Sequence, residues 1–131
     1  IIIFANMTPL TWISKKQNTV ESSTFGSEFV ALKHATEIIK GLRYKLRMLG
    51  VSLDGPTRMC CDSQSVVINS SFPESVLKKK HCSVAFHIVR EAIAAGILHI
   101  YWERSKSNLA DLFTKLLDPQ SRNHLIRAML N

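Results

Sequence analysis

The sequence has 131 residues, which is the size of one domain and leaves little room for a second core. Its 46% apolar and 21% charged residues are typical of a globular protein and exclude a disordered tail, a collagen-like repeat or a coiled-coil rod. Seventeen Lys and Arg residues against ten Asp and Glu residues give a net charge of +7. Such a surface attracts polyanions, and nucleic acid is the first candidate partner.

Three cysteines do not indicate a disulfide framework, because two of them, Cys60 and Cys61, are neighbours that cannot easily bridge one another. We therefore expect reduced thiols in an intracellular protein. No apolar run approaches the roughly 18 residues of a membrane helix, so we expect no membrane partner. The chain opens with Ile-Ile-Ile-Phe rather than Met, and we expect it to begin within a strand of a longer polypeptide.

Two apolar segments at the start of the chain predict a β-hairpin. Ile1–Asn6 and Leu10–Ser14 are rich in β-branched and aromatic residues, and Met7-Thr8-Pro9 separates them. A polar and basic loop follows over residues 15–20. Ser22-Ser23-Thr24 then offers N-cap residues for a helix.

A long amphipathic helix is the strongest signal in the sequence. From Thr24 to Leu49, apolar residues recur at steps of three and four, and the pattern stops at Gly50, where we expect the helix to end. The same spacing assigns position 28 to the apolar stripe, although that position holds Glu28. The apolar members of the stripe are Phe25, Leu32, Ala35, Ile39, Leu42, Leu46 and Leu49.

The second half of the chain alternates strands with helices. Together with the hairpin, this order predicts an α/β layer fold with a mixed sheet, in which the antiparallel strands come first and the helix-linked strands are parallel. The expected elements are a turn at 54–56, a strand at Thr57–Cys61 that runs into Asp62, a helix opening at Ser63-Gln64-Ser65, a basic turn at Lys78–His81, a helix at Ser83–Ala95 closed by Gly96, a strand at Ile97–Trp102, a short helix at Leu109–Lys115 capped by Asn108, and a last helix opened by Pro119.

Glu28 is a candidate functional residue because an ionised carboxylate on a buried helix face is costly unless a cation, a hydrogen-bond network or a metal ion compensates it. Capping does not explain this residue. A capping-box Glu lies three residues after the N-cap, and position 25 is Phe. Pairing with a Lys or Arg at the edge of the core remains the structural alternative.

Two further carboxylates lie where elements begin or end. Asp62 follows a strand and precedes a helix, and ligands of open α/β sheets bind just outside the carboxyl ends of strands. The structural alternative for Asp62 is the N-cap of the helix. Asp111 lies three residues after Asn108, and a capping role at the third helical position is the better interpretation of this residue alone.

The case for chemistry depends on Glu28, Asp62 and Asp111 together. Three gathered carboxylates repel one another, and divalent cations normally hold such clusters together. Hard carboxylate oxygens suit Mg²⁺ or Mn²⁺. The five histidines offer no rival site, since His81 and His87 are six residues apart. No Gly-rich phosphate loop or Ser-centred elbow supports NTP hydrolysis or acyl transfer.

Five segments match, in order and spacing, the motifs of one known family. The residues resemble the ribonuclease H domain at the end of the polyprotein of copia-type LTR retrotransposons, and the match runs from about Ile1 to Leu117. The segments are Trp12–Val20 against "W-S-S-K-K-Q-x-T-V", Ser23–Phe29 against "S-T-x-E-A-E-Y", Cys61–Ser65 against "C-D-N-Q-S", Lys80-His81 with His87–Glu91 against "K-H-I-D-x-x-x-H-x-x-R-E", and Leu109–Lys115 against "L-A-D-I-L-T-K".

The resemblance implies a three-layer ribonuclease H-like fold over residues 1–117, with a mixed five-stranded sheet whose first strand is missing here, and a C-terminal helix or tail over 118–131. It implies hydrolysis of the RNA strand of an RNA/DNA hybrid during reverse transcription, in a cytoplasmic retroelement particle. The implied cofactors are two Mg²⁺ (or Mn²⁺) ions, roughly 3.5 to 4 Å apart. The implied partner within the same polyprotein is an upstream reverse transcriptase domain.

The resemblance also implies roles for particular residues. Glu28 and Asp62 would be shared metal ligands, and Asp111 would be a more weakly held ligand of the second ion. Gln64 and Ser65 would help to position the substrate. For each lysine, a solvated basic turn is an equally good interpretation. The lysines that would contact phosphates are Lys15, Lys16, Lys78, Lys79 and Lys80.

One feature of the family is missing from this chain. The family's site includes an Asp on its first strand, whereas no acidic residue precedes Glu21 here. We therefore expect these 131 residues alone to be a poor nuclease. Two other hypotheses follow, namely a non-catalytic nucleic-acid-binding module of the polyprotein and, less favoured, a purely structural end domain.

Overall fold

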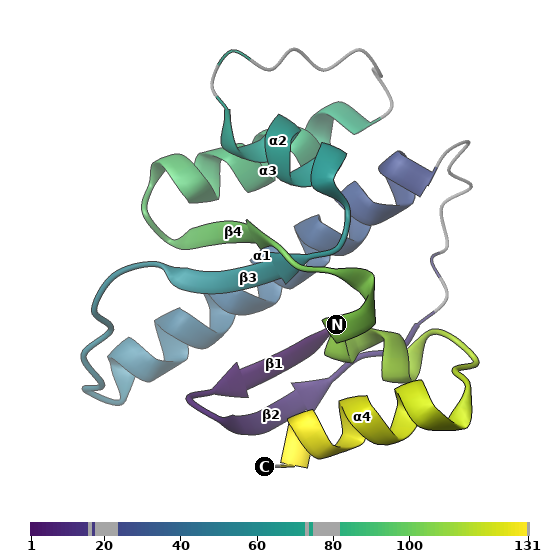
Figure 1. Cartoon of the computed structure of the whole chain (residues 1–131). Helices are drawn as coiled ribbons and strands as arrows, with labels where there is room; N and C mark the ends of the chain where they lie inside the picture. Colours follow the sequence, from purple (N-terminus) through teal and green to yellow (C-terminus); the bar gives the residue numbers. More distant parts are fainter. Residues whose placement is uncertain (16, 18–23, 73, 75–81, 131) are drawn as a thin grey trace. The chain divides into compact units, whose positions relative to one another are not determined.

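A computed structural model describes residues 1–15, 17, 24–72, 74 and 82–130 (Figure 1). It divides the chain into two compact units. The first unit combines Ile1–Thr19 with Glu103–Asn131, and the second unit is Val20–Trp102. The elements in chain order are β1 (Ile2–Ala5), β2 (Thr8–Trp12), α1 (Thr24–Met48), β3 (Thr57–Cys61), α2 (Gln64–Ser71), α3 (Ser83–Ala94), β4 (Leu98–Trp102), η2 (Ser105–Ser107), η3 (Leu109–Phe113) and α4 (Pro119–Leu130).

The hairpin of the first unit confirms the two predicted strands, but its turn comes earlier than predicted. β1 and β2 are antiparallel, and Asn6 adopts a left-handed φ of 55° between them. Ile3 pairs with Thr11 and Phe4 pairs with Pro9, so the register shifts at this point. The predicted break at Met7-Thr8-Pro9 is therefore wrong in position, because a bulge lets Pro9 lie within a strand.

The rest of the first unit packs around η3. Ser14 Oγ donates a hydrogen bond to the carbonyl oxygen of Phe113 at 2.8 Å, and the rings of Trp12 and Phe113 stack with centroids 6.0 Å apart. α4 packs against η3 and buries Leu125. The predicted helix over Leu109–Lys115 is instead a 3₁₀ helix that ends at Phe113.

In the second unit, α1 ends as the glycine signal predicts. Gly50 has a φ of +78°, a conformation that favours glycine. Its N–H donates to Arg47 O at 2.9 Å, and the N–H of Val51 donates to Leu46 O at 3.0 Å. These two bonds form a Schellman motif, which satisfies the last carbonyls of the helix.

The buried face of α1 differs from the predicted stripe. The helix packs against α3 and α2, and its buried residues all lie between Gly26 and Ile39, so that Phe29 is fully buried whereas Leu49 is 78% exposed. The prediction missed Phe29 and wrongly extended the core through Leu42, Leu46 and Leu49. The buried residues of α1 are Gly26, Phe29, Leu32, Ala35, Thr36 and Ile39.

β3 and β4 form a parallel pair, as predicted for helix-linked strands. Thr57 pairs with Leu98, and the register continues to Cys61 opposite Trp102. α2 and α3 pack against the pair, where Met59 and Ile100 are buried. α3 ends at a second Schellman motif, in which Gly96 has a φ of +65°.

The α/β class is therefore confirmed, but the described strands do not form the predicted single mixed sheet. They hydrogen-bond as two separate two-stranded sheets, β1–β2 and β3–β4. Local sequence patterns identify strands, whereas the partner of a strand depends on distant segments. No helix in the described part of the chain is long and apolar enough to cross a membrane.

Candidate functional site

Asp62 occupies the carboxyl end of the parallel strand pair. β3 ends at Cys61 and α2 begins at Gln64, which confirms the predicted order of strand, acid and helix. The N-cap of α2 is Ser63, so the interpretation of Asp62 as the N-cap is wrong. Its backbone oxygen accepts a hydrogen bond from the indole Nε1–H of Trp102 at 3.2 Å. The ends of β3 and β4 are thus tied together at the position where α/β folds place ligands.

Glu28 lies at the edge of the buried face of α1, next to Phe29. Its side chain is half-buried, and Oε2 is buried without a hydrogen-bond partner among the described residues. The ion pairs that join described residues do not include Glu28 either, so the pairing alternative gains no support. A buried carboxylate oxygen without a donor is costly, because its lost hydration is not replaced.

Cys61 connects these two acids electrostatically. Burial raises the pKa of the Cys61 thiol, and the hydrogen bond from the thiol to the Ser63 carbonyl oxygen lowers it. The negative charges of Glu28, Asp62 and the neighbouring Cys60 raise this pKa. Glu28 and Asp62 therefore both influence the pKa of the same thiol in the second unit. They lie 33 intervening residues apart in the sequence, Glu28 on a helix and Asp62 at the end of a strand. Two carboxylates of the predicted trio lie in the same neighbourhood.

Asp111 belongs to the first unit and already has a cation. Its side chain is 9% exposed, and Oδ2 accepts a hydrogen bond from Lys115 Nζ at 2.8 Å. Asn108 is the N-cap of η3, and its Oδ1 accepts a hydrogen bond from the N–H of Ala110 at 3.1 Å. The structure places Asp111 in the first turn of a capped helix, as the structural interpretation predicts. Its carboxylate pairs with Lys115, however, and the N–H of Asn108 donates to Ser105 O instead.

Within the described residues, no group of three or more His, Cys, Asp or Glu side chains is arranged to hold a metal ion. The convergence of all three acids stays a prediction. Glu28 and Asp62 nevertheless fit a hard divalent cation, because both offer carboxylate oxygens and one buried oxygen of Glu28 has no donor. Asp111 fits it less well, since Lys115 already neutralises its charge.

The predicted substrate residues are only partly described. Gln64 and Ser65 are exposed in the first turn of α2, and Ser65 Oγ lies 3.2 Å from Ser63 Oγ, with which it shares a hydrogen bond. Lys15 is exposed. The other predicted phosphate contacts, Lys16, Lys78, Lys79 and Lys80, lie outside the described residues.

Two residues of this site escaped the sequence analysis. Lys115 follows Asp111 by four residues, and that spacing of opposite charges on a helix could have indicated the ion pair. Trp102 carried no comparable signal, because its bond to Asp62 depends on the pairing of β3 with β4, between which the chain forms α2 and α3.

The relatives of this chain are retrovirus-related Pol polyproteins from plant transposons. The chain is 26% identical over 116 residues to the polyproteins of transposons RE2 and RE1 of Arabidopsis thaliana. It is 27% identical over 121 residues to that of transposon TNT 1-94 of Nicotiana tabacum. These alignments cover 88% to 92% of the chain but only 8% to 9% of the relatives. The chain thus spans less than a tenth of the length of the polyproteins it matches.

No protein-family model matches the chain, and no solved structure matches it significantly.

Proposed function

We propose that this chain is the ribonuclease H region of a retrotransposon Pol polyprotein and that it contributes to hydrolysis of the RNA strand of an RNA/DNA hybrid. Three findings support the proposal: the five motifs, the Pol polyprotein relatives and the pair of acids around Cys61. The observation that carries it is the buried Oε2 of Glu28, which has no donor in the described part of the chain.

In this proposal Glu28, Asp62 and, more weakly, Asp111 would hold two Mg²⁺ or Mn²⁺ ions, which when bound activate water and stabilise the leaving oxygen. The chain's own residues set the positions of the ligands. The packing of Phe29 fixes Glu28 on α1, and the Trp102 indole fixes the backbone of Asp62. Lys115 would have to release Asp111 before that carboxylate could take part.

The wider context of the proposal follows the same resemblance. A ribonuclease H-like domain would span residues 1–117, with 118–131 as a C-terminal helix. An upstream reverse transcriptase domain of the same polyprotein would be its partner, and a cytoplasmic retroelement particle its location. Gln64 and Ser65 at the start of α2 would position the hybrid, and Lys15, with the basic residues outside the described ranges, would contact its phosphates.

The test is Mg²⁺-dependent cleavage of a labelled RNA/DNA hybrid by the longest polypeptide that contains these 131 residues. Glu28→Gln and Asp62→Asn should each lower the cleavage rate by at least about 100-fold, because loss of a direct ligand should cost at least as much as loss of the groups that support one. The measurement is the single-turnover rate at saturating hybrid.

Matched controls separate the site from general effects of charge. Glu37→Gln removes an acid from the same helix, and Glu37 is exposed and lies near Lys33 and His34. Asp54→Asn removes an exposed acid from the loop before β3. Both control variants should keep the cleavage rate within about twofold. Full activity in Glu28→Gln and Asp62→Asn would refute the site.

A second candidate function is a non-catalytic nucleic-acid-binding module. The ion pair between Asp111 and Lys115 favours it, since it neutralises one proposed ligand, and so does the net charge of +7. This function predicts salt-dependent binding of the hybrid with no Mg²⁺-dependent cleavage in the same assay.

A further inference from the structure

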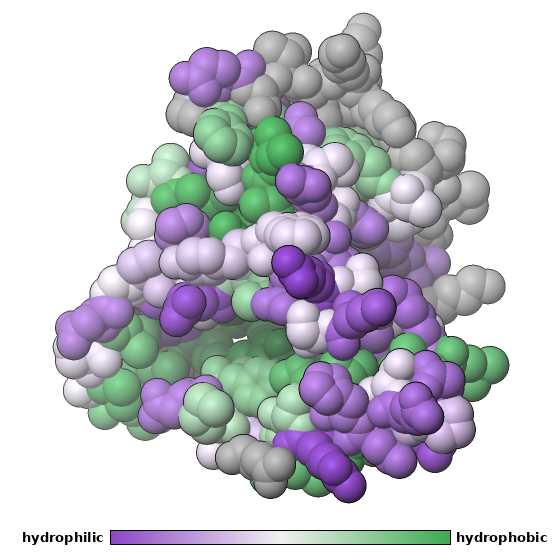
Figure 2. Space-filling view, viewed as in Figure 1, coloured by the Kyte–Doolittle hydropathy of each residue, from purple (hydrophilic) through white to green (hydrophobic). Residues whose placement is uncertain are grey.

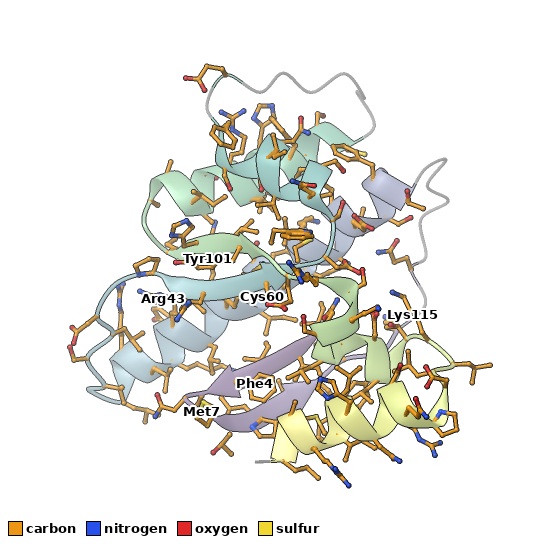
Figure 3. All side chains as sticks on the ribbon, in the orientation of Figure 1. Phe4, Met7, Arg43, Cys60, Tyr101 and Lys115 are labelled. Atoms are coloured by element: carbon orange, nitrogen blue, oxygen red, sulfur yellow. The ribbon has the colours of Figure 1, made fainter. Side chains whose placement is uncertain are left out.

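The β3–β4 pair has one covered face and one open face. Residues alternate along each strand, so that Met59 and Ile100 lie buried on the side of the helices. The opposite side carries two cross-strand pairs, Arg58 with His99 and Cys60 with Tyr101, and all four residues are exposed. We call these four residues the open face. Figure 3 labels Tyr101 and Cys60 on the two strands, and Figure 2 shows mainly hydrophilic surface over this part of the second unit.

The side chains of the open face are organised around Tyr101. The imidazole of His99 stacks on the Tyr101 ring, with centroids 4.5 Å apart and planes inclined by 29°. The guanidinium carbon of Arg58 lies 5.1 Å from the ring centroid, within the range of a cation–π interaction. In the parallel pair, Arg58 lies opposite His99, two residues before Cys60 and Tyr101 on their strands. Arg58 and His99 therefore approach the Tyr101 ring from the same end of the strands. Tyr101 remains 38% exposed.

The chemistry of the open face favours a polyanion with planar groups over an apolar protein cover. Parallel sheets normally have both faces covered, and strands buried on both faces are continuously apolar. Here the alternate positions of the two strands, on the exposed face, include Arg, His and Tyr. An apolar cover would remove the hydration of the Arg58 charge and would offer no hydrogen bonds in exchange. None of the four residues is acidic, and the chain carries a net charge of +7.

We propose that the open face binds single-stranded nucleic acid. One base stacks on the exposed part of the Tyr101 ring, and Arg58 contacts the neighbouring phosphate while its stem stays against the ring. Single strands suit this face because their bases are free to stack on aromatic side chains, which duplex bases are not. This inference does not depend on hydrolysis by Glu28 and Asp62, and it holds equally if the chain has no nuclease activity.

The test is equilibrium binding of labelled oligo-dT and oligo-U of about 12 nucleotides, within the usual site size of one binding domain. Tyr101→Thr should weaken binding by about tenfold with an unchanged salt dependence, because it removes stacking and keeps a β-branched residue in the strand. Tyr101→Phe should bind like the original chain. Arg58→Gln should weaken binding and reduce the slope of log affinity against log salt by about 0.7, the value for one phosphate contact on a single strand.

Two variants on α1 serve as matched controls. Tyr44→Thr and Arg47→Gln remove an exposed tyrosine and an exposed arginine outside the open face, and they should change affinity by less than twofold. Inorganic polyphosphate should compete poorly, since it lacks bases. Equal losses at Tyr44 and Tyr101, equal competition by polyphosphate, or no binding by the original chain would each overturn the proposal.

A footprint without any substitution tests the same face independently of variant folding. Cys60 lies opposite Tyr101 and is exposed, whereas Cys82 is 2% exposed. Saturating oligo-dT should slow alkylation of Cys60 by iodoacetamide at least about fivefold, measured by tandem mass spectrometry of the peptide, because the bound strand would cover the thiol. An unchanged alkylation rate at saturation would place the oligonucleotide elsewhere and refute the open face as its site.

Discussion

Asp111 and Lys115 form an ion pair in which one partner is buried and the other is half-exposed. The carboxylate is 9% exposed and the ammonium 51% exposed. Removing the cation would leave a buried charge with poorer compensation, which costs more than the loss of a surface pair. The half-exposed position of Lys115 moderates that cost, because water reaches the vacated space.

We predict that Lys115→Met lowers the free energy of unfolding by about 1 to 2 kcal/mol in urea denaturation near neutral pH. Lys33→Met is the matched control, since Lys33 and Glu37 form a pair with the same spacing, but its carboxylate is 46% exposed whereas that of Asp111 is 9% exposed. It should cost no more than about 0.5 kcal/mol. Equal effects of the two variants would show that Asp111 gains nothing special from its cation.

Cys61 reports the charge of the acids around it. Burial is the main cause that raises its pKa, a hydrogen bond to the backbone of Ser63 lowers this pKa, and the charges of Glu28 and Asp62 raise it. Removal of one negative charge should therefore lower the pKa and increase the thiolate fraction at a fixed pH. In a Cys60→Ser background, Glu28→Gln should therefore shift the pH profile of Cys61 alkylation to lower pH. Glu37→Gln should leave the profile in place, and a shift of the same size in that control would mean that Glu28 is not near the thiol.

At the scale of elements, the sequence predicts helix ends best where the backbone conformation requires one residue type, such as glycine. Gly50 and Gly96 mark the ends of α1 and α3 because both positions require a positive φ. The order of strand, acid and helix around Asp62 could be predicted from the sequence equally well. The buried stripe of α1 was less predictable from the sequence. Its apolar spacing continues past Ile39, whereas its buried residues end there.

We predict that Gly50→Ala lowers the free energy of unfolding by about 1 kcal/mol, because alanine strains the left-handed conformation that ends α1. Gly41→Ala, within α1, should change the free energy of unfolding in the opposite direction. Gly41 is exposed, and a Cβ added there meets nothing within 4 Å, so this substitution should stabilise the protein by about 0.5 to 1 kcal/mol. Urea denaturation of both variants checks the pair, and equal signs would contradict the Schellman cap.

At the scale of the whole molecule, both strand pairs were predictable from the sequence, but their division into two separate sheets was not. The α/β class follows from the order of elements, whereas the pairing of strands into two sheets is set by contacts distant in sequence. The same limit applies to the candidate site. Helical spacing singled out Glu28, and a place between a strand and a helix singled out Asp62. No pattern predicted that both would act on Cys61 or that Lys115 would pair with Asp111.

The division into two small sheets has a practical consequence. Every described strand pairs with one other described strand, so the four strands have four edges without a described strand partner, where a single sheet of the same strands would have two. Such edges are templates for pairing between molecules. Purified material should therefore self-associate as its concentration rises, and dilution should reverse this association.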